Sequence, residues 1–259
     1  MPSKELINAY RDAATGFIIL NQPETRNALS LEMRSEFRRH LEEMSADGQL
    51  RAIVIGGVGK AFCAGGDLKT LASETVASML ERQHNVQHLL RLMMTGDKPV
   101  IAAVEGLALG AGLSIALACD IVVASREARF GAVFGKVGLG PDLGLTWTLQ
   151  RRVGIGRARL MLLSGRLVPA EQGTNWGLVD QLVESDQALS AAHDIARDIA
   201  ANAPLPTKIV RRILAQPFAS LDQALDFEAV LQTLLVGTDD FAEGYAAFRE
   251  RRNPAFQSR

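Results

Sequence analysis

The chain has 259 residues, with 28 Lys and Arg against 29 Asp and Glu, and 47% of its residues are hydrophobic. This composition is typical of a globular protein with one or two domains. The nearly balanced charge argues against a nucleic-acid-binding protein, which usually carries a basic stripe, although a few local Lys and Arg can still bind a small polyanion. The 23 glycines, against 5% aromatic residues, indicate sharp turns or close approaches of the backbone.

The cysteine content and the N-terminus favour a cytoplasmic protein. Cys63 and Cys119 form neither a disulfide framework nor a metal-binding spacing, which fits a reducing compartment. Charged residues within the first dozen positions argue against a signal peptide. The longest apolar stretch, residues 107–119, is interrupted by glycine and is too short to span a bilayer. We therefore expect no membrane partner.

The first part of the chain alternates strand and helix patterns. Ser30 is a suitable N-cap for an amphipathic helix that follows it. The expected strands are residues 16–20, 51–57, 100–104 and 121–124, and the expected helices are residues 31–44, about 71–94 and 113–119. Strands separated by helices imply βαβ crossovers, so the predicted fold class is α/β with a layered core.

From about residue 157 onward the pattern is helical, after a break near residues 153–157. The candidate helices are residues 170–176, 189–202, 206–215, 221–235 and 240–251. The last of them carry apolar residues on more than one face, which predicts packing against a neighbouring subunit. We divide the chain into an α/β core over residues 1–190 and a helical oligomerisation region over residues 191–259.

Two glycine-rich loops, residues 57–69 and 106–112, each lie where a strand passes into a helix. Helix N-termini present free N–H groups, so those of Gly66 and Ala111 are suited to hold one oxygen between them as an oxyanion hole. The alternative is that the glycines only form tight turns. Neither loop has the spacing of a phosphate-binding or dinucleotide-binding motif.

Several motifs resemble those of the enoyl-CoA hydratase/isomerase (crotonase) superfamily. The resemblance covers nearly the whole chain in the family's order, and its motifs are LNQPETRNALS (20–30), GKAFCAGGDLK (59–69), KPVIAAVEGLALGAG (98–112), CDIVVA (119–124), FGKVGLGPD (134–142) and DDFAEGYAAFRERRNPAF (239–256). It implies a spiral of βαβ units with a helical C-terminal trimerisation region, and a homotrimer or a dimer of trimers.

The same resemblance implies an acyl-CoA thioester as substrate, with no cofactor beyond its CoA moiety and no metal. The thioester carbonyl would lie between the N–H groups of Gly66 and Ala111. The residues implied to line the CoA path are Arg26, Ala28, Ala64, Asp67, Leu68 and Lys69, with Ala64 near the adenine. Lys69 is a candidate for the nucleotide phosphates, although a solvated lysine is an equal alternative.

Two glutamates of the family's hydratases are missing here. Their positions are occupied by Ser114 and Phe134, and neither side chain can act as a general acid or base at neutral pH. Phe134 would make the acyl pocket drier, and Ser114 would bond either to substrate or to its own helix. The standard hydration mechanism is therefore disfavoured.

One carboxylate remains. Asp142 resembles the aspartate of the 3-enoyl/2-enoyl-CoA isomerase branch, which includes ring-opening epoxyphenylacetyl-CoA isomerases. A single carboxylate suffices for an allylic shift, in which a proton leaves one carbon and returns two carbons away. An apolar pocket would raise its pKa toward a useful base strength. The alternative is a helix N-cap after Pro141.

Other candidate groups have structural interpretations that we favour. His84 and His88 have helical i, i+4 spacing but no third metal ligand, Asp67 is expected to cap a helix, and Glu105 and Cys63 are expected to be non-catalytic. The rival functions are an acyl-CoA hydratase, lyase or hydrolase with an atypical acid/base set, and a non-catalytic acyl-CoA-binding protein.

Overall fold

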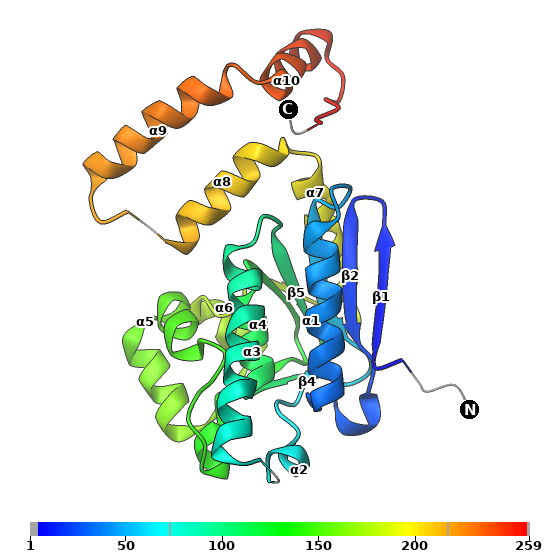
Figure 1. The fold of residues 1–259 in the computed structure, drawn as a ribbon, viewed down its shortest axis with the longest axis vertical. Coiled ribbons are helices and arrows are strands. Elements are labelled where there is room, and N and C mark those ends of the chain that lie inside the picture. The colour runs from blue at the N-terminus through cyan, green and yellow to red at the C-terminus, as the bar shows by residue number, and fades with distance from the viewer. Residues whose placement is uncertain (1–4, 73, 217, 258–259) are drawn as a thin grey trace.

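The computed structural model describes residues 5–72, 74–216 and 218–257, and these form two β-sheets covered by helices (Figure 1). The strands of the larger sheet, in sequence order, are β1 (Ile7–Asp12), β2 (Thr15–Leu20), β3 (Ala52–Gly57), β5 (Val100–Val104), β7 (Ile121–Ser125) and β10 (Gln181–Val183). Those of the smaller sheet are β4 (Ala61–Cys63), β6 (Leu107–Leu109), β8 (Arg129–Gly131) and β9 (Leu167–Pro169).

The helices follow the strands in alternation and then continue alone at the C-terminus. They are α1 (Leu31–Ala46), α2 (Leu68–Leu71), α3 (Val76–Thr95), α4 (Ala111–Ala118), α5 (Leu145–Ser164), α6 (Ala170–Trp176), α7 (Ala188–Ala200), α8 (Pro204–Ala215), α9 (Leu221–Leu235) and α10 (Asp239–Glu250). Two short 3₁₀ helices are η1 (Pro23–Thr25) and η2 (Val133–Val137).

Each repeat of the spiral contributes one strand to each of the two sheets. The chain leaves the larger sheet after β3, β5 and β7, and each time it forms the next strand of the smaller sheet, which is β4, β6 or β8. The pairs β3/β5, β5/β7, β4/β6 and β6/β8 are all parallel. This confirms the expected α/β class, a spiral of βαβ units.

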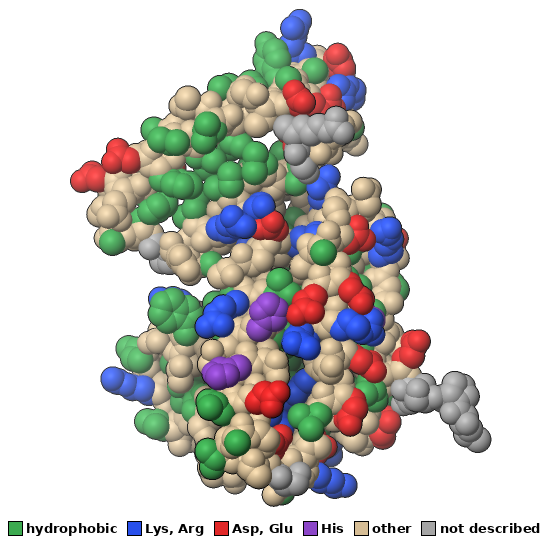
Figure 2. Space-filling view, in the orientation of Figure 1, with side chains coloured by type: hydrophobic (Ala, Val, Ile, Leu, Met, Phe, Trp, Pro, Cys, Tyr) green, Lys and Arg blue, Asp and Glu red, His purple; other side chains and the backbone are tan. Residues whose placement is uncertain are grey.

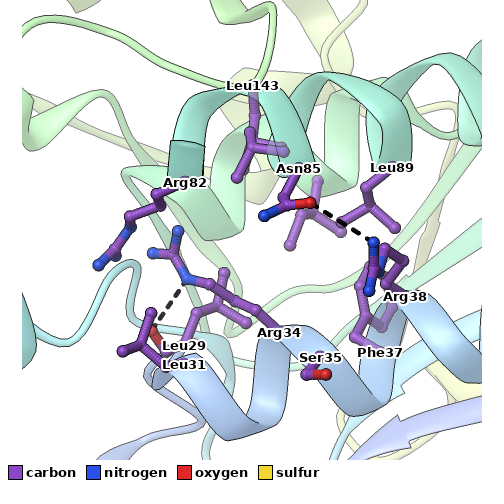
Figure 3. Close-up of a pocket in the computed structure, with 12 residues that line it drawn as sticks. Leu29, Leu31, Arg34, Ser35, Phe37, Arg38, Arg82, Asn85, Leu89 and Leu143 are labelled. Carbon is purple, nitrogen blue, oxygen red and sulfur yellow. Dashed lines mark hydrogen bonds between the residues drawn. The ribbon is translucent and has the colours of Figure 1, made fainter. Parts of the chain in front are cut away.

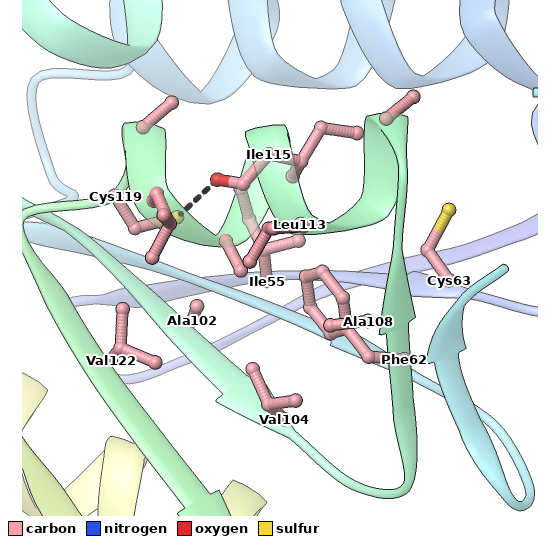
Figure 4. Close-up of a cluster of buried hydrophobic side chains, with 14 of the residues drawn as sticks. Ile55, Phe62, Cys63, Ala102, Val104, Ala108, Leu113, Ile115, Cys119 and Val122 are labelled. Atoms are coloured by element: carbon pink, nitrogen blue, oxygen red, sulfur yellow. Dashed lines mark hydrogen bonds between the residues drawn. The ribbon is translucent and has the colours of Figure 1, made fainter. Parts of the chain in front are cut away.

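Both faces of the larger sheet are buried, which explains its continuous apolar runs. In β2, Ile18 and Leu20 face the main core, while Phe17 and Ile19 face the opposite layer. The opposite layer is α7, which contributes Ala188, Ala192 and Ala196. On the main-core side, α4 lies directly over the strands (Figure 4).

Two predicted helices differ from the structure. The helix expected over about residues 71–94 is two helices, α2 and α3, because the side chain of Thr75 caps a new N-terminus by accepting from Ser78 N–H at 3.2 Å. Position 73 lies outside the described residues. Helical structure also begins at Leu145 rather than near residue 157, and the predicted break is a kink inside α5 at Gly154, whose φ is +77°.

The C-terminal helices extend away from the body of the molecule, as Figure 1 shows. Arg211 of α8 is buried and donates to the Asp120 carboxylate at 2.7 Å, which anchors α8 to the core. No side chain of α9 is buried, and Figure 2 shows green hydrophobic surface over this region. The C-terminal helical region is thus confirmed, while the division at residue 190 stays a prediction.

Among the described residues, no helix has both the length and the apolar character required to cross a membrane.

Candidate active site

The first glycine-rich loop is fixed by backbone hydrogen bonds on both sides of Gly66. The N–H of Leu29 donates to the carbonyl of Gly65 at 2.8 Å, and the N–H of Asp67 donates to the carbonyl of Leu29 at 3.2 Å. Because these bonds come from the residues that flank Gly66, its own N–H is directed away from Leu29. A bond of 2.9 Å from Ala64 N–H to the carbonyl of Arg26 ties the same loop to the segment before α1.

The second loop packs against the first. A Cβ atom added at Gly65 would lie 3.7 Å from the N atom of Ala111, and one added at Gly112 would lie 2.2 Å from the carbonyl oxygen of Cys63. Ala111 is the first residue of α4, so its N–H has no acceptor within the helix. In the described part of the chain, no hydrogen bond is donated by the N–H of Gly66 or Ala111. Both N–H groups are therefore available to a ligand.

Both loops open onto one cavity of about 340 Å³. It is closed by η2 and by the segment that precedes α5. Its lining residues are Arg34, Ala64, Gly65, Gly66, Leu68, Leu71, Met79, Arg82, Gln83, Gly110, Ala111, Val133, Phe134, Val137, Leu139, Gly140, Pro141 and Asp142. The structure thus brings together six of the predicted site residues, Ala64, Gly66, Leu68, Ala111, Phe134 and Asp142.

Asp142 is not the cap of α5. The N-cap is Gly144, with φ of +66° and no side-chain capping bond, so the capping alternative is wrong. Instead, Oδ1 of Asp142 is buried and has no hydrogen-bond partner among the described residues. Burial raises the pKa of this carboxyl group, and the nearby charges of Arg34 and Arg82 oppose that rise without cancelling it.

Arg34 and Arg82 were not predicted as site residues. Arg82 is only 6% exposed and pairs with Glu74 at 3.1 Å between Nη1 and Oε1. The Nε of Arg34 donates to the carbonyl of Leu29 at 3.1 Å, and burial together with the charge of Arg82 lowers the pKa of Arg34 to about 10.

A sequence signal for Arg82 exists. It lies on the buried stripe of α3 with Val86, Leu89 and Met93, so a charged residue occupies an apolar position of an amphipathic helix.

Five other predicted residues, Arg26, Ala28, Asp67, Lys69 and Ser114, lie outside the lining of this cavity. Asp67 caps α2 by accepting from the N–H of Lys69 at 3.0 Å, as expected. The hydroxyl of Ser114 is buried and donates to the carbonyl of Gly110 at 3.2 Å, so it bonds to its own helix. Arg26 and Lys69 are exposed to solvent.

The weaker candidates have structural roles. Burial raises the pKa of the Cys63 thiol to about 12, so it is protonated at neutral pH. The carboxylate of Glu105 accepts from the N–H of Ala188 at 2.9 Å, and His88 lies 3.1 Å from the Glu42 carboxylate at the surface. Within the described ranges, no group of three or more His, Cys, Asp or Glu side chains is arranged to hold a metal ion.

Comparison with known proteins agrees with this architecture. The sequence matches the enoyl-CoA hydratase/isomerase family over residues 11–259, and the chain belongs to that family. It is 34% identical to the 1,2-epoxyphenylacetyl-CoA isomerase of Escherichia coli, with 97% of this chain and 98% of that protein covered. It is 37% identical to the 2,3-dehydroadipyl-CoA hydratase of the same organism, with 93% and 94% covered.

Solved structures show the same fold. The enoyl-CoA hydratase of Bacillus anthracis superposes on this chain with a TM-score of 0.93 at 29% sequence identity. The superposition covers 98% of this chain and 100% of the hydratase. The protein is therefore an enzyme of the enoyl-CoA hydratase/isomerase family with the crotonase fold, and membership implies an acyl-CoA substrate.

Proposed function

We propose that the protein is an acyl-CoA isomerase that shifts a double bond, converting a 3-enoyl-CoA to a 2-enoyl-CoA. The observation that carries this proposal is the acid/base content of the cavity. Of the described residues that line it, only Asp142 carries a carboxylate, and it lines the same cavity as Gly66 and Ala111. Ser114 and Phe134 occupy the places where the family's hydratases have glutamates.

In the proposed reaction the thioester oxygen is bound by the N–H groups of Gly66 and Ala111. Asp142 removes a proton from the carbon next to the carbonyl, and the resulting dienolate is stabilised by these two N–H groups. The protonated Asp142 then returns the proton to the carbon two positions further along the chain. The raised pKa of Asp142 brings its basicity closer to that needed for both steps.

The apolar side chains of Phe134, Val137 and Leu139 support isomerisation over hydration, because they offer no polar group to hold the water that a hydratase must add. The same oxyanion site is compatible with ring-opening isomerisation of an aryl-acetyl-CoA epoxide, the reaction type for which the E. coli relative is named.

Hydration is the second candidate function, since another relative is named a hydratase. Incubation with a 3-enoyl-CoA and, separately, with a 2-enoyl-CoA separates the two reactions, because an isomerase converts the first to a 2-enoyl-CoA without adding water, whereas a hydratase converts the second to a 3-hydroxyacyl-CoA. Formation of a 3-hydroxyacyl-CoA as the first product would contradict the isomerase proposal.

Asp142→Asn tests the base directly. We expect turnover to fall by about 10²–10⁴-fold, the usual contribution of a positioned acid/base group, while thioester binding persists. Asp194→Asn, which removes an exposed carboxylate on α7, is the matched control. Turnover that survives Asp142→Asn would remove Asp142 from the mechanism.

We also propose a cytoplasmic homotrimer or dimer of trimers. The apolar residues of α9 and α10 support assembly, since Leu234 and Phe248 are 67% and 83% exposed. The free, buried thiols of Cys63 and Cys119 fit a reducing location.

A further inference from the structure

Two guanidinium groups lie beside the predicted oxyanion site. Arg34 of α1 and Arg82 of α3 line both the 340 Å³ cavity and a smaller one of about 150 Å³, which Figure 3 shows between these helices. A Cβ atom added at Gly66 would lie 3.0 Å from Nη2 of Arg34 and 3.9 Å from Nη2 of Arg82. A ligand held at Gly66 is therefore within reach of both cations.

The two guanidinium groups are incompletely paired within the protein. Glu74 pairs with Nη1 of Arg82, but Nε of the same side chain is buried without a hydrogen-bond partner. For Arg34, the described residues offer no carboxylate within 4.0 Å, and Asp142 forms no ion pair with either arginine at that distance. The cationic side chains of Arg34 and Arg82 thus share the site with two carboxylates. Glu74 forms an ion pair with Arg82, and Asp142 forms none.

Most of the other side chains in the wall cannot satisfy these donors. Leu68, Leu71, Met79, Phe134, Val137 and Leu139 supply only apolar side chains to the cavity. An alkyl chain bound here would further desolvate the arginines and give them no acceptor, which is costly for buried charges. A carboxylate would accept several charge-assisted hydrogen bonds from the two planar groups.

We propose that the substrate is the CoA monothioester of a short dicarboxylic acid, whose free carboxylate is bound by Arg34 and Arg82. This inference rests on the proposed function, because it takes the thioester carbonyl to be bound at Gly66 and Ala111. It adds that the site selects acyl groups whose far end carries a carboxylate.

The test compares saturated thioesters, which bind without a double bond to shift. Isothermal titration measures succinyl-, glutaryl- and adipyl-CoA against butyryl-, valeryl- and hexanoyl-CoA, so that each pair has the same chain length. We expect the dicarboxylic member of at least one pair to bind about tenfold or more tightly, as one to two charge-assisted hydrogen bonds would give.

Arg34→Gln should reduce that ratio to near one, and Arg34→Lys should retain part of it because the charge remains. The matched control is Arg39→Gln on the same helix, since Arg39 is exposed and pairs with Glu43 at 3.0 Å. It should leave the ratio unchanged. The ratio is informative even if a variant alters the cavity, because both members of a pair experience the same change.

Equal or weaker binding of all three dicarboxylic thioesters by the unaltered protein would overturn the inference, as would a ratio that persists in Arg34→Gln. If no thioester of either class binds, the acyl-CoA site itself is wrong and the inference falls with it. If the preference holds but no 2-enoyl-CoA forms from a 3-enoyl-CoA, only the isomerase proposal fails.

Discussion

At the scale of single residues, Asp142 experiences two opposing influences. Burial raises the pKa of its carboxyl group, while the charges of Arg34 and Arg82 lower it, and burial prevails. A base must be ionised to act, so the proposed activity should decrease as pH falls through this raised pKa. The acid limb of the pH profile of kcat/KM is expected above the range of an ordinary aspartate.

Removal of Arg34 should shift that limb further. Arg34→Gln takes away a cation that favours the ionised form, so the limb should move to higher pH. Profiles of the unaltered protein, Arg34→Gln and the control Arg39→Gln test this with a 3-enoyl-CoA whose acyl chain carries no charge. A limb that stays in place, or moves to lower pH, in Arg34→Gln would contradict the assignment of this limb to Asp142.

The raised pKa of Asp142 also affects stability. A carboxyl group with a higher pKa in the folded state loses its proton first in the unfolded chain, so folding stability decreases as pH rises between the two pKa values. The Asp142→Asn side chain stays neutral, so this substitution should raise the melting temperature at pH 7. The advantage should disappear below about pH 3, where the Asp142 carboxyl group is protonated in both the folded and the unfolded chain. A lower melting temperature at pH 7 would indicate that Asp142 has a structural role.

Site residues differed in how readily they could be predicted. Gly66 and Ala111 were candidates because their loops precede predicted helices, and Asp142 was a candidate only through the resemblance of its motif to the isomerase branch; the structure places all three at one cavity. Arg34 lies in a charged helix, α1, where arginine is ordinary, whereas Arg82 occupies a buried, otherwise apolar position of α3 that the sequence pattern could have flagged. Only the tertiary packing of α1 against α3 turns them toward the same cavity.

At the scale of elements, the strands with continuous apolar sequence were predictable. β3, β5 and β7 are buried on both faces, so their sequences are apolar throughout. β4 and β6 have three residues each and lie within the glycine-rich loops, where no periodicity can develop. The glycine content of these loops predicts only turns, whereas the structure forms part of them into parallel strands of the smaller sheet.

The contact between these two loops depends on Gly112. A Cβ atom there would meet the carbonyl oxygen of Cys63 at 2.2 Å and its Cβ at 2.8 Å, and the backbone of β4 cannot move aside easily. Gly112→Ala should therefore lower the free energy of unfolding by about 1–3 kcal/mol, as overpacking does. Because it displaces Ala111 from Gly66, kcat/KM should fall as well.

Gly156→Ala is the matched control for that change. Gly156 also lies in a helix, α5, but a Cβ atom added there has nothing within 4 Å. The Gly156→Ala substitution should raise the free energy of unfolding by about 0.5–1 kcal/mol, since alanine has a higher helix propensity than glycine. Chemical denaturation measures both. Equal stability of the two variants would show that the loops do not pack tightly at Gly112.

At the scale of the whole molecule, local patterns did not reveal that each turn of the chain visits two sheets. That arrangement depends on which strands pair, and strand pairing is a tertiary property. Only the resemblance of the motifs to a known family predicted the spiral. The apolar surfaces of the last helices, in contrast, were evident from residues that face more than one side of each helix.

Those surfaces lead to a test of assembly. Leu234 of α9 is 67% exposed, whereas the neighbouring Thr233 lies on the side of the helix that carries Asp222 and Asp226. Burying one leucine contributes about 1.5–3 kcal/mol, and a symmetric assembly repeats that contribution in every subunit. Leu234→Glu should therefore reduce the mass measured by light scattering from a trimer or hexamer toward a monomer, while Thr233→Glu, which adds the same charge, should not. An unaltered protein that is already monomeric, or a Leu234→Glu variant with unchanged mass, would exclude this face of α9 from the subunit interface.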